Sequence, residues 1–314
     1  MPFPLISSSE EFNLHFRDEF WQEIARTICE RHNISGATLL RSDHGENIVF
    51  LCGDEYVVKI YTPFRQGFVR EKAAFEFSRG KTSLKLPEII GAGNIGGFDY
   101  LVMTQLEGGL MTLEEWLKTD ISEQIAIVSR LAAGLKELHS HDAQSIDFNW
   151  NAFLASQIDT CIERQRAAGA NPEWLKSLPR YLEENVKLLP EDLPTVFLHG
   201  DVHFGNLRVK KDKGKWVISG LFDWADSLSG FHEYEFVAPG VLMIQGQGEL
   251  QREFFRAYGY KDNEIDSTLR RRLMLLTILY ECSDLRKYAL RLKPEAVNFT
   301  LEEIEKAIWA FAAK

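Results

Sequence analysis

The chain has 314 residues, of which 45% are hydrophobic and 26% charged, an ordinary globular composition with room for about two domains or lobes. Its formal net charge of -10 disfavours nucleic acid and anionic membranes as partners and would attract a cationic substrate. No stretch approaches the roughly 18 uninterrupted apolar residues of a membrane span, and the beginning of the sequence shows no secretory signal.

Cysteine usage adds a prediction about the compartment. The four cysteines stand far apart and form neither a zinc spacing nor a redox spacing; they are Cys29, Cys52, Cys161 and Cys282. We therefore expect the protein in a reducing cytoplasm.

The N-terminal part predicts one helix and then a small sheet. Ser7 to Ser9 before Glu10 and Glu11 form a capping-box start, after which apolar residues recur at helical spacing: Phe12, Phe16, Phe20, Trp21, Ile24 and Ile28. Between Gly36 and Pro63 the runs ATLLRS, ENIVFLCG and EYVVKIY are separated by turn signals, which predicts three antiparallel strands. The sequence G-x-x-x-x-G-K-[ST] is absent, which argues against the P-loop class.

Lys59 lies in the third of these runs with apolar neighbours on both sides, so it needs either solvent or a charged partner. The helical stretch FVREKAAFEFSRG follows and offers Glu71, with Glu76 as a second candidate. A strand lysine that binds the α- and β-phosphates, oriented by a glutamate on the next helix, is the arrangement of kinases. The alternative is an edge-strand lysine and a solvated glutamate.

The middle of the chain predicts a strand, a boundary and a series of helices. LPEIIGAGNIGG is typical of a loop and strand, Tyr100–Met103 is an apolar strand, and Gly108 with Gly109 marks the boundary between two lobes, residues 1–106 and 107–314. Thr112 and Glu115 form a capping box, and a helical pattern runs to Leu138. Two more helices are expected between residues 151 and 189, the second beginning at Asn171 and Pro172.

Residues 195–223 carry the strongest functional signal. Two apolar runs, 195–198 and 216–222, each end in polar groups: Asp201 and Asn206 after the first, Asp223 after the second. Leu207–Val209 and the turn KKDKGK predict a hairpin that folds the second run back beside the first. This set of groups suits phosphoryl transfer, in which a base lies near the hydroxyl that accepts the phosphate, and an amide oxygen and a carboxylate bind Mg²⁺. Asp201 would be the base, and Asn206 and Asp223 the Mg²⁺ ligands.

Other interpretations of this stretch exist. Asp201 taken alone is typical of a turn, Asn206 of a loop or cap, and His199 and His203 of structural histidines that tether the loop. A metal-dependent hydrolase would use His199, Asp201 and His203 as ligands, but this leaves Asn206 and Asp223 unexplained.

HGDVHFGN followed by LFDW resembles the aminoglycoside phosphotransferase family, whose signature is H-G-D, an asparagine five residues after that aspartate, and a later D-W or D-F. The resemblance covers nearly the whole chain. It implies an α+β, bilobal, protein-kinase-like fold, with a small antiparallel-sheet lobe that binds nucleotide and a larger, mainly helical lobe. It also implies a cytoplasmic enzyme that transfers the γ-phosphate of ATP or GTP, with Mg²⁺, to the hydroxyl of a small molecule.

The resemblance extends to the nucleotide site. The segment SDHGEN, with Gly45 and Asn47, would lie over the phosphates, although alone it indicates only a hairpin turn. Met103 would line the pocket, and the backbone of Thr104 and Leu106 would meet the adenine edge.

The acceptor is less well indicated. After Asp223 the family usually has G-D-P and then D-L-A, whereas here Gly230 is followed by Phe231 and His232, and Glu235 replaces the later aspartate. Candidate ligands for a cationic acceptor are four carboxylates, which could instead cap helices, pair locally or be solvated: Asp226, Glu233, Glu281 and Asp284. The last two belong to a helical region, Leu269–Leu292, before a final helix capped by Thr300 and Glu303.

The expected activity is therefore that of a small-molecule kinase, with an aminoglycoside-type antibiotic as one acceptor, and resistance to that drug as one consequence. A metabolite kinase acting on choline-, homoserine- or sugar-like acceptors is an alternative, because fold does not settle substrate. A nucleotide-binding protein without turnover is an alternative of another class.

Overall fold

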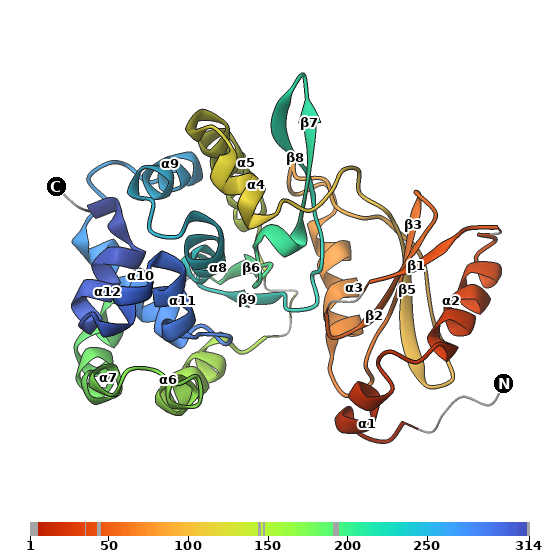
Figure 1. Cartoon of the computed structure of the whole chain (residues 1–314), viewed down its shortest axis with the longest axis horizontal. Helices are drawn as coiled ribbons and strands as arrows, with labels where there is room; N and C mark the ends of the chain where they lie inside the picture. The colour runs from red at the N-terminus through yellow and green to blue at the C-terminus, as the bar shows by residue number, and fades with distance from the viewer. Residues whose placement is uncertain are drawn as a thin grey trace.

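The computed structural model describes residues 6–34, 36–42, 45–143, 146, 148–190 and 195–312. Figure 1 shows a sheet-containing part on one side and a mainly helical part on the other. The predicted α+β fold, with a small antiparallel sheet and a larger helical region, is confirmed. The lobe boundary after residue 106 stays a prediction; it falls between the last strand of the sheet and the next helix.

The small part is built on a five-stranded sheet in the order β1-β2-β3-β5-β4. All neighbouring strands are antiparallel, and the predicted three-stranded meander forms the first three. Lys59 lies opposite Val49 on one side and Leu101 on the other, so its backbone is in the middle of the sheet. The strands are β1 (Leu39–Arg41), β2 (Ile48–Cys52), β3 (Tyr56–Ile60), β4 (Ile89–Ile95) and β5 (Phe98–Thr104).

Two helices form where the sequence predicted one. Helix α1 spans Ser9–Leu14 and α2 spans Phe20–Arg31, so the prediction of a continuous helix was wrong at residues 15–19. The break allows Trp21 Nε1 to donate to the carbonyl of His15 at 2.8 Å, and it places the ring of Phe12 5.6 Å from that of Trp21. Tertiary packing of aromatic rings therefore overrides the helical pattern. Helix α3 (Gly67–Ser78) follows β3 and carries Glu71.

The larger part contains most of the helices. The capping boxes at Thr112 and Thr300 form, and Asn171 caps the helix that begins at Pro172, all as predicted. The helices are α4 (Leu113–Lys118), α5 (Ile121–His139), α6 (Trp150–Ala167), α7 (Pro172–Asn185), α8 (Val237–Pro239), α9 (Gly248–Tyr258), α10 (Ser267–Leu279), α11 (Leu285–Leu292) and α12 (Leu301–Ile308). Single turns fill the connections: η1 (Val186–Leu188), η2 (Phe204–Asn206), η3 (His232–Phe236), η4 (Gly240–Ile244), η5 (Pro294–Asn298) and η6 (Ala310–Ala312).

The region Leu269–Leu292 is two helices rather than one. Helix α10 ends at Leu279, and α11 begins only at Leu285, where the side chain of Asp284 accepts a hydrogen bond from the N–H of Lys287. Between them the N–H of Glu281 donates to the hydroxyl of Tyr234 at 3.0 Å. These two side-chain acceptors satisfy backbone groups that a continuous helix would have paired internally.

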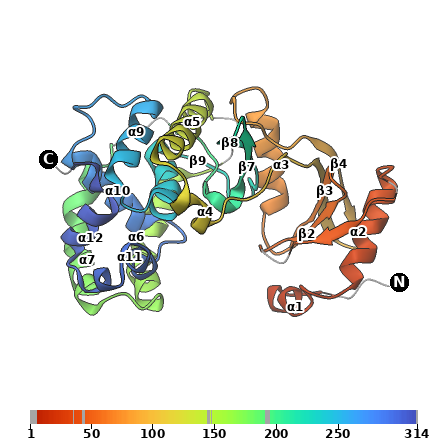
Figure 2. The same cartoon turned by 45° about the horizontal axis from the view of Figure 1, so that its top comes forward.

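Residues 195–230, which include the stretch with the strongest functional signal, contain four short strands. Strand β7 (Leu207–Asp212) and β8 (Lys215–Leu221) form the predicted hairpin, whose turn places Lys213 and Gly214 at positive φ. The ends of the two apolar runs lie close, since the side chain of His199 bonds to the carbonyl of Phe222, but the strand that pairs with β6 (Val196–Leu198) is β9 (Leu228–Gly230). In both views the β7–β8 hairpin lies between the helical part and helix α3 (Figure 1, Figure 2).

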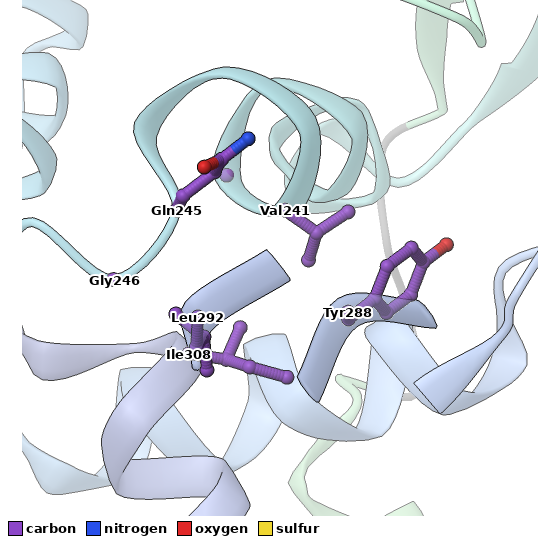
Figure 3. A pocket seen from close by; sticks show the side chains of 7 residues that line it. Val241, Gln245, Gly246, Tyr288, Leu292 and Ile308 are labelled. Atoms are coloured by element: carbon purple, nitrogen blue, oxygen red, sulfur yellow. The ribbon is translucent and has the colours of Figure 1, made fainter. Parts of the chain in front are cut away.

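Figure 3 shows a narrow gap in the core of the helical part. It lies among Val241, Tyr288, Leu292 and Ile308 and is too narrow to hold a water molecule, so it reflects packing rather than a ligand site. Among the helices that the structure describes, none has the length and apolar character needed to cross a membrane.

Candidate active site

The ammonium of Lys59 is buried between two carboxylates. Its Nζ lies 2.6 Å from Glu71 Oε2 and 2.7 Å from Asp223 Oδ1, and the Lys59 and Glu71 residues are 5% and 1% exposed. Burial alone would lower the pKa of Lys59, but the two carboxylates outweigh it and hold the pKa above its ordinary value. The predicted Lys59–Glu71 pair is present, whereas Glu76 is exposed.

Glu71 also connects the sheet to the segment that carries Asp223. Its Oε2 accepts a hydrogen bond from the hydroxyl of Tyr61 at 2.6 Å, and its Oε1 accepts one from the backbone N–H of Trp224 at 3.1 Å. Both carboxylate oxygens therefore have donors, as a buried charge requires. Helix α3, strand β3 and the chain after β8 meet at this one side chain.

Asp223 follows β8 in a left-handed conformation with φ of 63°, which is uncommon for a residue other than glycine. Burial would raise the pKa of Asp223, but the ammonium of Lys59 outweighs burial and lowers the pKa below its ordinary value. Since its side chain is still 42% exposed, the carboxylate is both ionised and accessible.

Asp201 lies in the loop after β6, with its carboxylate held by two neighbours. Oδ2 accepts a hydrogen bond from Asn206 Nδ2 at 3.0 Å and lies 3.2 Å from His203 Nε2. Burial opposes ionisation, but the bonds from His203 and Asn206 outweigh it and keep the pKa of Asp201 below its ordinary value. Asp201 is therefore ionised at neutral pH.

The two histidines act as tethers, as predicted. His203 Nδ1 accepts from the N–H of Gly205 at 2.9 Å, which assigns the ring proton to Nε2, beside Asp201. His199 Nδ1 accepts from the N–H of Asp201 at 3.2 Å, and its Nε2 donates to the carbonyl of Phe222 at 3.0 Å. His199 thus joins the loop after β6 to the end of β8, although these strands are not paired.

The same ring atoms argue against the hydrolase alternative. His199 uses both nitrogens on backbone groups, and His203 uses one. Across the described ranges, no cluster of three or more histidine, cysteine, aspartate or glutamate side chains is arranged to hold a metal ion. Asn206 carries an amide and stands outside this class of ligands, so the pair Asn206 and Asp223 is a separate candidate.

Two supporting residues were missed from the sequence. Glu235, from η3, is 1% exposed and accepts from the N–H groups of His199 at 2.6 Å and Gly200 at 3.0 Å. Tyr280, at the end of α10, donates to the carbonyl of Gly200 at 2.8 Å. The signal for Glu235 was a carboxylate inside the apolar run EYEFVAPG, whereas the sequence offers no signal for Tyr280.

The donor atoms of Asn206 and Asp223 are of the types that bind Mg²⁺. The amide nitrogen of Asn206 bonds to Asp201, which leaves its Oδ1 available, and Asp223 uses only Oδ1 on Lys59. Within the part of the chain that the structure describes, neither Asn206 Oδ1 nor Asp223 Oδ2 takes part in a hydrogen bond. One amide and one carboxylate oxygen suit a hard cation such as Mg²⁺.

The residues predicted to contact nucleotide lie around β2, β3 and β5. Gly45 has φ of 104°, and Asn47 Oδ1 accepts from the N–H of Thr62, whereas Asp43 and His44 of the predicted phosphate segment fall outside the described residues. Met103 is buried near the end of β5, and Thr104 is the last residue of that strand. Leu106 packs over Gly220 of β8, where a side chain at that position would collide with it.

The four candidate acceptor ligands separate into two groups. Asp226 is an exposed residue, and partial burial of its carboxyl, with repulsion from Asp201, Asp223 and Glu281, raises the pKa of Asp226 to about 6. Glu281 is also exposed.

The other two carboxylates are engaged locally, and these contacts argue against their use on an acceptor. Glu233 is 1% exposed and binds Arg272 through both oxygens and the hydroxyl of Tyr260. Asp284 caps α11.

Comparison with solved structures shows the same fold. The GDP complex of wild-type aminoglycoside 2'-phosphotransferase-IIIa superposes with a TM-score of 0.71 over 92% of this chain and 98% of that chain, at 12% identity. The GDP and kanamycin complex of APH(2")-IIia gives 0.69 over 91% and 98%, at 14% identity. The streptomycin–ATP–APH(2")-IIa complex gives 0.59 over 90% and 97%, at 19% identity.

A search of curated protein sequences found no match. A family model described as the APH phosphotransferase enzyme family matches residues 36–275, from the first strand of the sheet into α10. That span includes Lys59, Glu71, Asp201, Asn206 and Asp223. Because the match covers well over half of the sequence, the chain belongs to the phosphotransferase enzyme family.

Proposed function

We propose that this phosphotransferase transfers the γ-phosphate of ATP or GTP to a hydroxyl of a small, positively charged molecule. The observation that carries the proposal is the contact between Lys59 and Asp223. The residue before Asp223, Phe222, donates its N–H to the carbonyl of Asn206 at 3.0 Å, so the lysine of the sheet lies near the loop that contains Asp201 and Asn206. Four residues of the types that phosphoryl transfer requires therefore converge from positions up to 164 residues apart.

Lys59 binds the nucleotide phosphates. The lysine keeps its charge in a buried position, where an ammonium attracts phosphate oxygens more strongly than it would in water. Glu71 keeps its ion pair with Lys59 when nucleotide binds. Asp223 gives up its contact with Lys59, and the phosphates take its place. We assign Gly45 and Asn47 to the phosphates, and Met103, Thr104 and Leu106 to the base.

Asp201 accepts the proton of the acceptor hydroxyl. As the acceptor oxygen bonds to the γ-phosphorus, the bond from that phosphorus to the bridging oxygen breaks, and its electrons leave with ADP or GDP. A carboxylate with a low pKa is a weak base, so its main effect is to orient the hydroxyl, which suits a loose phosphoryl transition state. Mg²⁺ bound by Asn206 and Asp223 would neutralise charge on the phosphates.

The acceptor is proposed to be cationic because Asp226 and Glu281 add exposed negative charge beside Asp201. Kanamycin, gentamicin and streptomycin appear in the complexes of similar folds, so an aminoglycoside is the first acceptor to test. Choline-like, homoserine-like and sugar acceptors form the second set. The use of nucleoside triphosphate and the cysteines, which are free, fit a reducing cytoplasm.

The test is a thermal-shift titration with ATP and with GTP, each with and without Mg²⁺, followed by transfer assays over a panel of acceptors. Nucleotide that binds the folded state raises the unfolding temperature, by linkage, and the rise grows with the ratio of nucleotide concentration to its dissociation constant. We expect a metal-dependent rise with at least one nucleotide and turnover with a cationic acceptor. No rise at millimolar nucleotide would overturn the proposal, and a rise without turnover on any acceptor would favour a non-catalytic nucleotide-binding protein.

A further inference from the structure

Gly200, the residue before Asp201, has both of its backbone polar groups held by side chains from the helical part. Its N–H donates to Glu235 Oε1 at 3.0 Å, and its carbonyl accepts from the hydroxyl of Tyr280 at 2.8 Å. Its φ of 87° lies in the left-handed region, where glycine has no steric penalty. The backbone leading into Asp201 is therefore fixed from two directions by residues at least 35 positions away.

The hydroxyl of Tyr280 also reaches the carboxylate of Asp201. It lies 3.3 Å from Asp201 Oδ1, while the other oxygen, Oδ2, is held by Asn206 and His203. Tyr280 is 4% exposed, and burial and the charge of Asp201 raise its pKa well above the ordinary value. The phenol thus keeps its proton at any working pH and can donate it to only one acceptor at a time or share it between the two.

We propose that Tyr280 is a positioning residue for Asp201: its hydroxyl fixes the carbonyl of Gly200 and, with it, the direction of Asp201 Oδ1 toward the acceptor. This inference rests on the proposed function, in which Asp201 accepts the acceptor proton. Tyr280 acts through Asp201 and is not assigned any contact with substrate.

The test compares Tyr280→Phe with Tyr288→Phe. Tyr288 is also 4% exposed, its hydroxyl donates to a backbone carbonyl, that of Cys282, at 3.3 Å, and Figure 3 shows it bordering the narrow gap of the core. Both variants lose one buried hydroxyl from the same segment, but only one loses a contact with the loop of Asp201. We would measure kcat and KM for transfer, nucleotide affinity by calorimetry, and the unfolding temperature of each.

For Tyr280→Phe we expect kcat to fall about 10-fold, as for a lost hydrogen bond near a charged group, with nucleotide affinity within a factor of about two of wild type. Tyr288→Phe should keep the wild-type kcat. Equal kcat values for Tyr280→Phe and wild type would overturn the inference, as would an equal fall in both variants that follows their unfolding temperatures. A wild-type protein that binds nucleotide but transfers to no acceptor would remove the proposed function together with this inference, whereas an active wild type with an active Tyr280→Phe removes the inference alone.

Discussion

The two halves of the candidate site are stabilised in different ways. On the nucleotide side, Lys59, Glu71 and Asp223 are held by opposite charges contributed by β3, α3 and the end of β8. On the acceptor side, Asp201 is held by hydrogen bonds from Asn206, His203 and Tyr280, all within the helical part of the molecule. One half is an ionic cluster that joins both parts, and the other is a loop supported locally.

Under the proposed function, this difference predicts which half rearranges during the reaction. The ammonium of Lys59 is already neutralised by Asp223, so phosphates can bind it fully only if that carboxylate finds another partner. Asp201, in contrast, has its supporting contacts in place before any ligand binds. A base that is already held in position needs little reorganisation at the moment of reaction. A lysine that is paired with a carboxylate, in contrast, can contact the phosphates fully only after nucleotide has displaced that carboxylate.

Asp201→Asn is expected to separate the functions of the two halves most clearly, because it should affect transfer but not nucleotide binding. The change removes the proton acceptor while keeping the size of the side chain, so transfer should fall about 100- to 10,000-fold. Nucleotide affinity should stay nearly unchanged, because Asp201 belongs to the acceptor half. Steady-state kinetics and calorimetry measure the two quantities, and normal turnover in this variant would refute the role of Asp201.

Glu71→Ala should have the largest effect on stability. The substitution leaves a buried ammonium with one partner fewer and removes the acceptor of Tyr61 and Trp224, and breaking a buried ion pair typically costs about 3–5 kcal/mol. Urea unfolding measures the loss. Glu76→Ala, an exposed change on the same helix, is the matched control and should change the free energy of unfolding by less than about 0.5 kcal/mol. Equal values for both variants would show that the cluster adds no stability.

Asp223→Ala should distinguish metal-bound from free nucleotide. Loss of a proposed metal ligand should weaken binding of Mg²⁺–ATP by about 10-fold or more. Metal-free ATP should bind the variant as well as or better than wild type, because a carboxylate that repels phosphate and occupies Lys59 is gone. Calorimetry with Mg²⁺ and with EDTA measures both affinities, and unchanged affinity in the presence of metal would show that Asp223 does not bind the ion.

The smallest expected effect is a pH dependence on the acceptor side. Because the pKa of Asp226 is raised to about 6, this carboxyl gains its charge as the pH rises from about 5 to 7. KM for a cationic acceptor should therefore fall over that interval, by about 5-fold if the gain is that of an exposed ion pair. Asp226→Asn should remove the trend, and an uncharged acceptor should not show it in wild type. An identical trend in the variant would assign it to another group.

Much of this architecture could be predicted from local sequence. The strands of the sheet, the caps at Thr112 and Thr300, and the Lys59–Glu71 pair depend on residues near one another in the chain. The order of Asp201, Asn206 and Asp223 likewise identified the region of the site. Each of these features has a spacing of a few residues or a single connecting loop, which a pattern can express.

The features that could not be predicted depend on distant partners. Strand β6 pairs with β9 rather than β8, and Glu235 and Tyr280 reach Gly200 from 35 and 80 residues away. In each case the contact forms only once the chain has folded, so the local sequence pattern does not predict it.

Gly200 has a consequence for how such an enzyme can diverge. A side chain at this position would meet the carbonyl oxygen of Asp226 at 2.4 Å and would also disfavour the left-handed backbone. Selection should therefore remove substitutions of Gly200. The exposed positions 226, 281 and 282 can vary without disturbing its backbone. New substrates would then be acquired by changing these exposed residues, while the loop that carries Asp201 is kept.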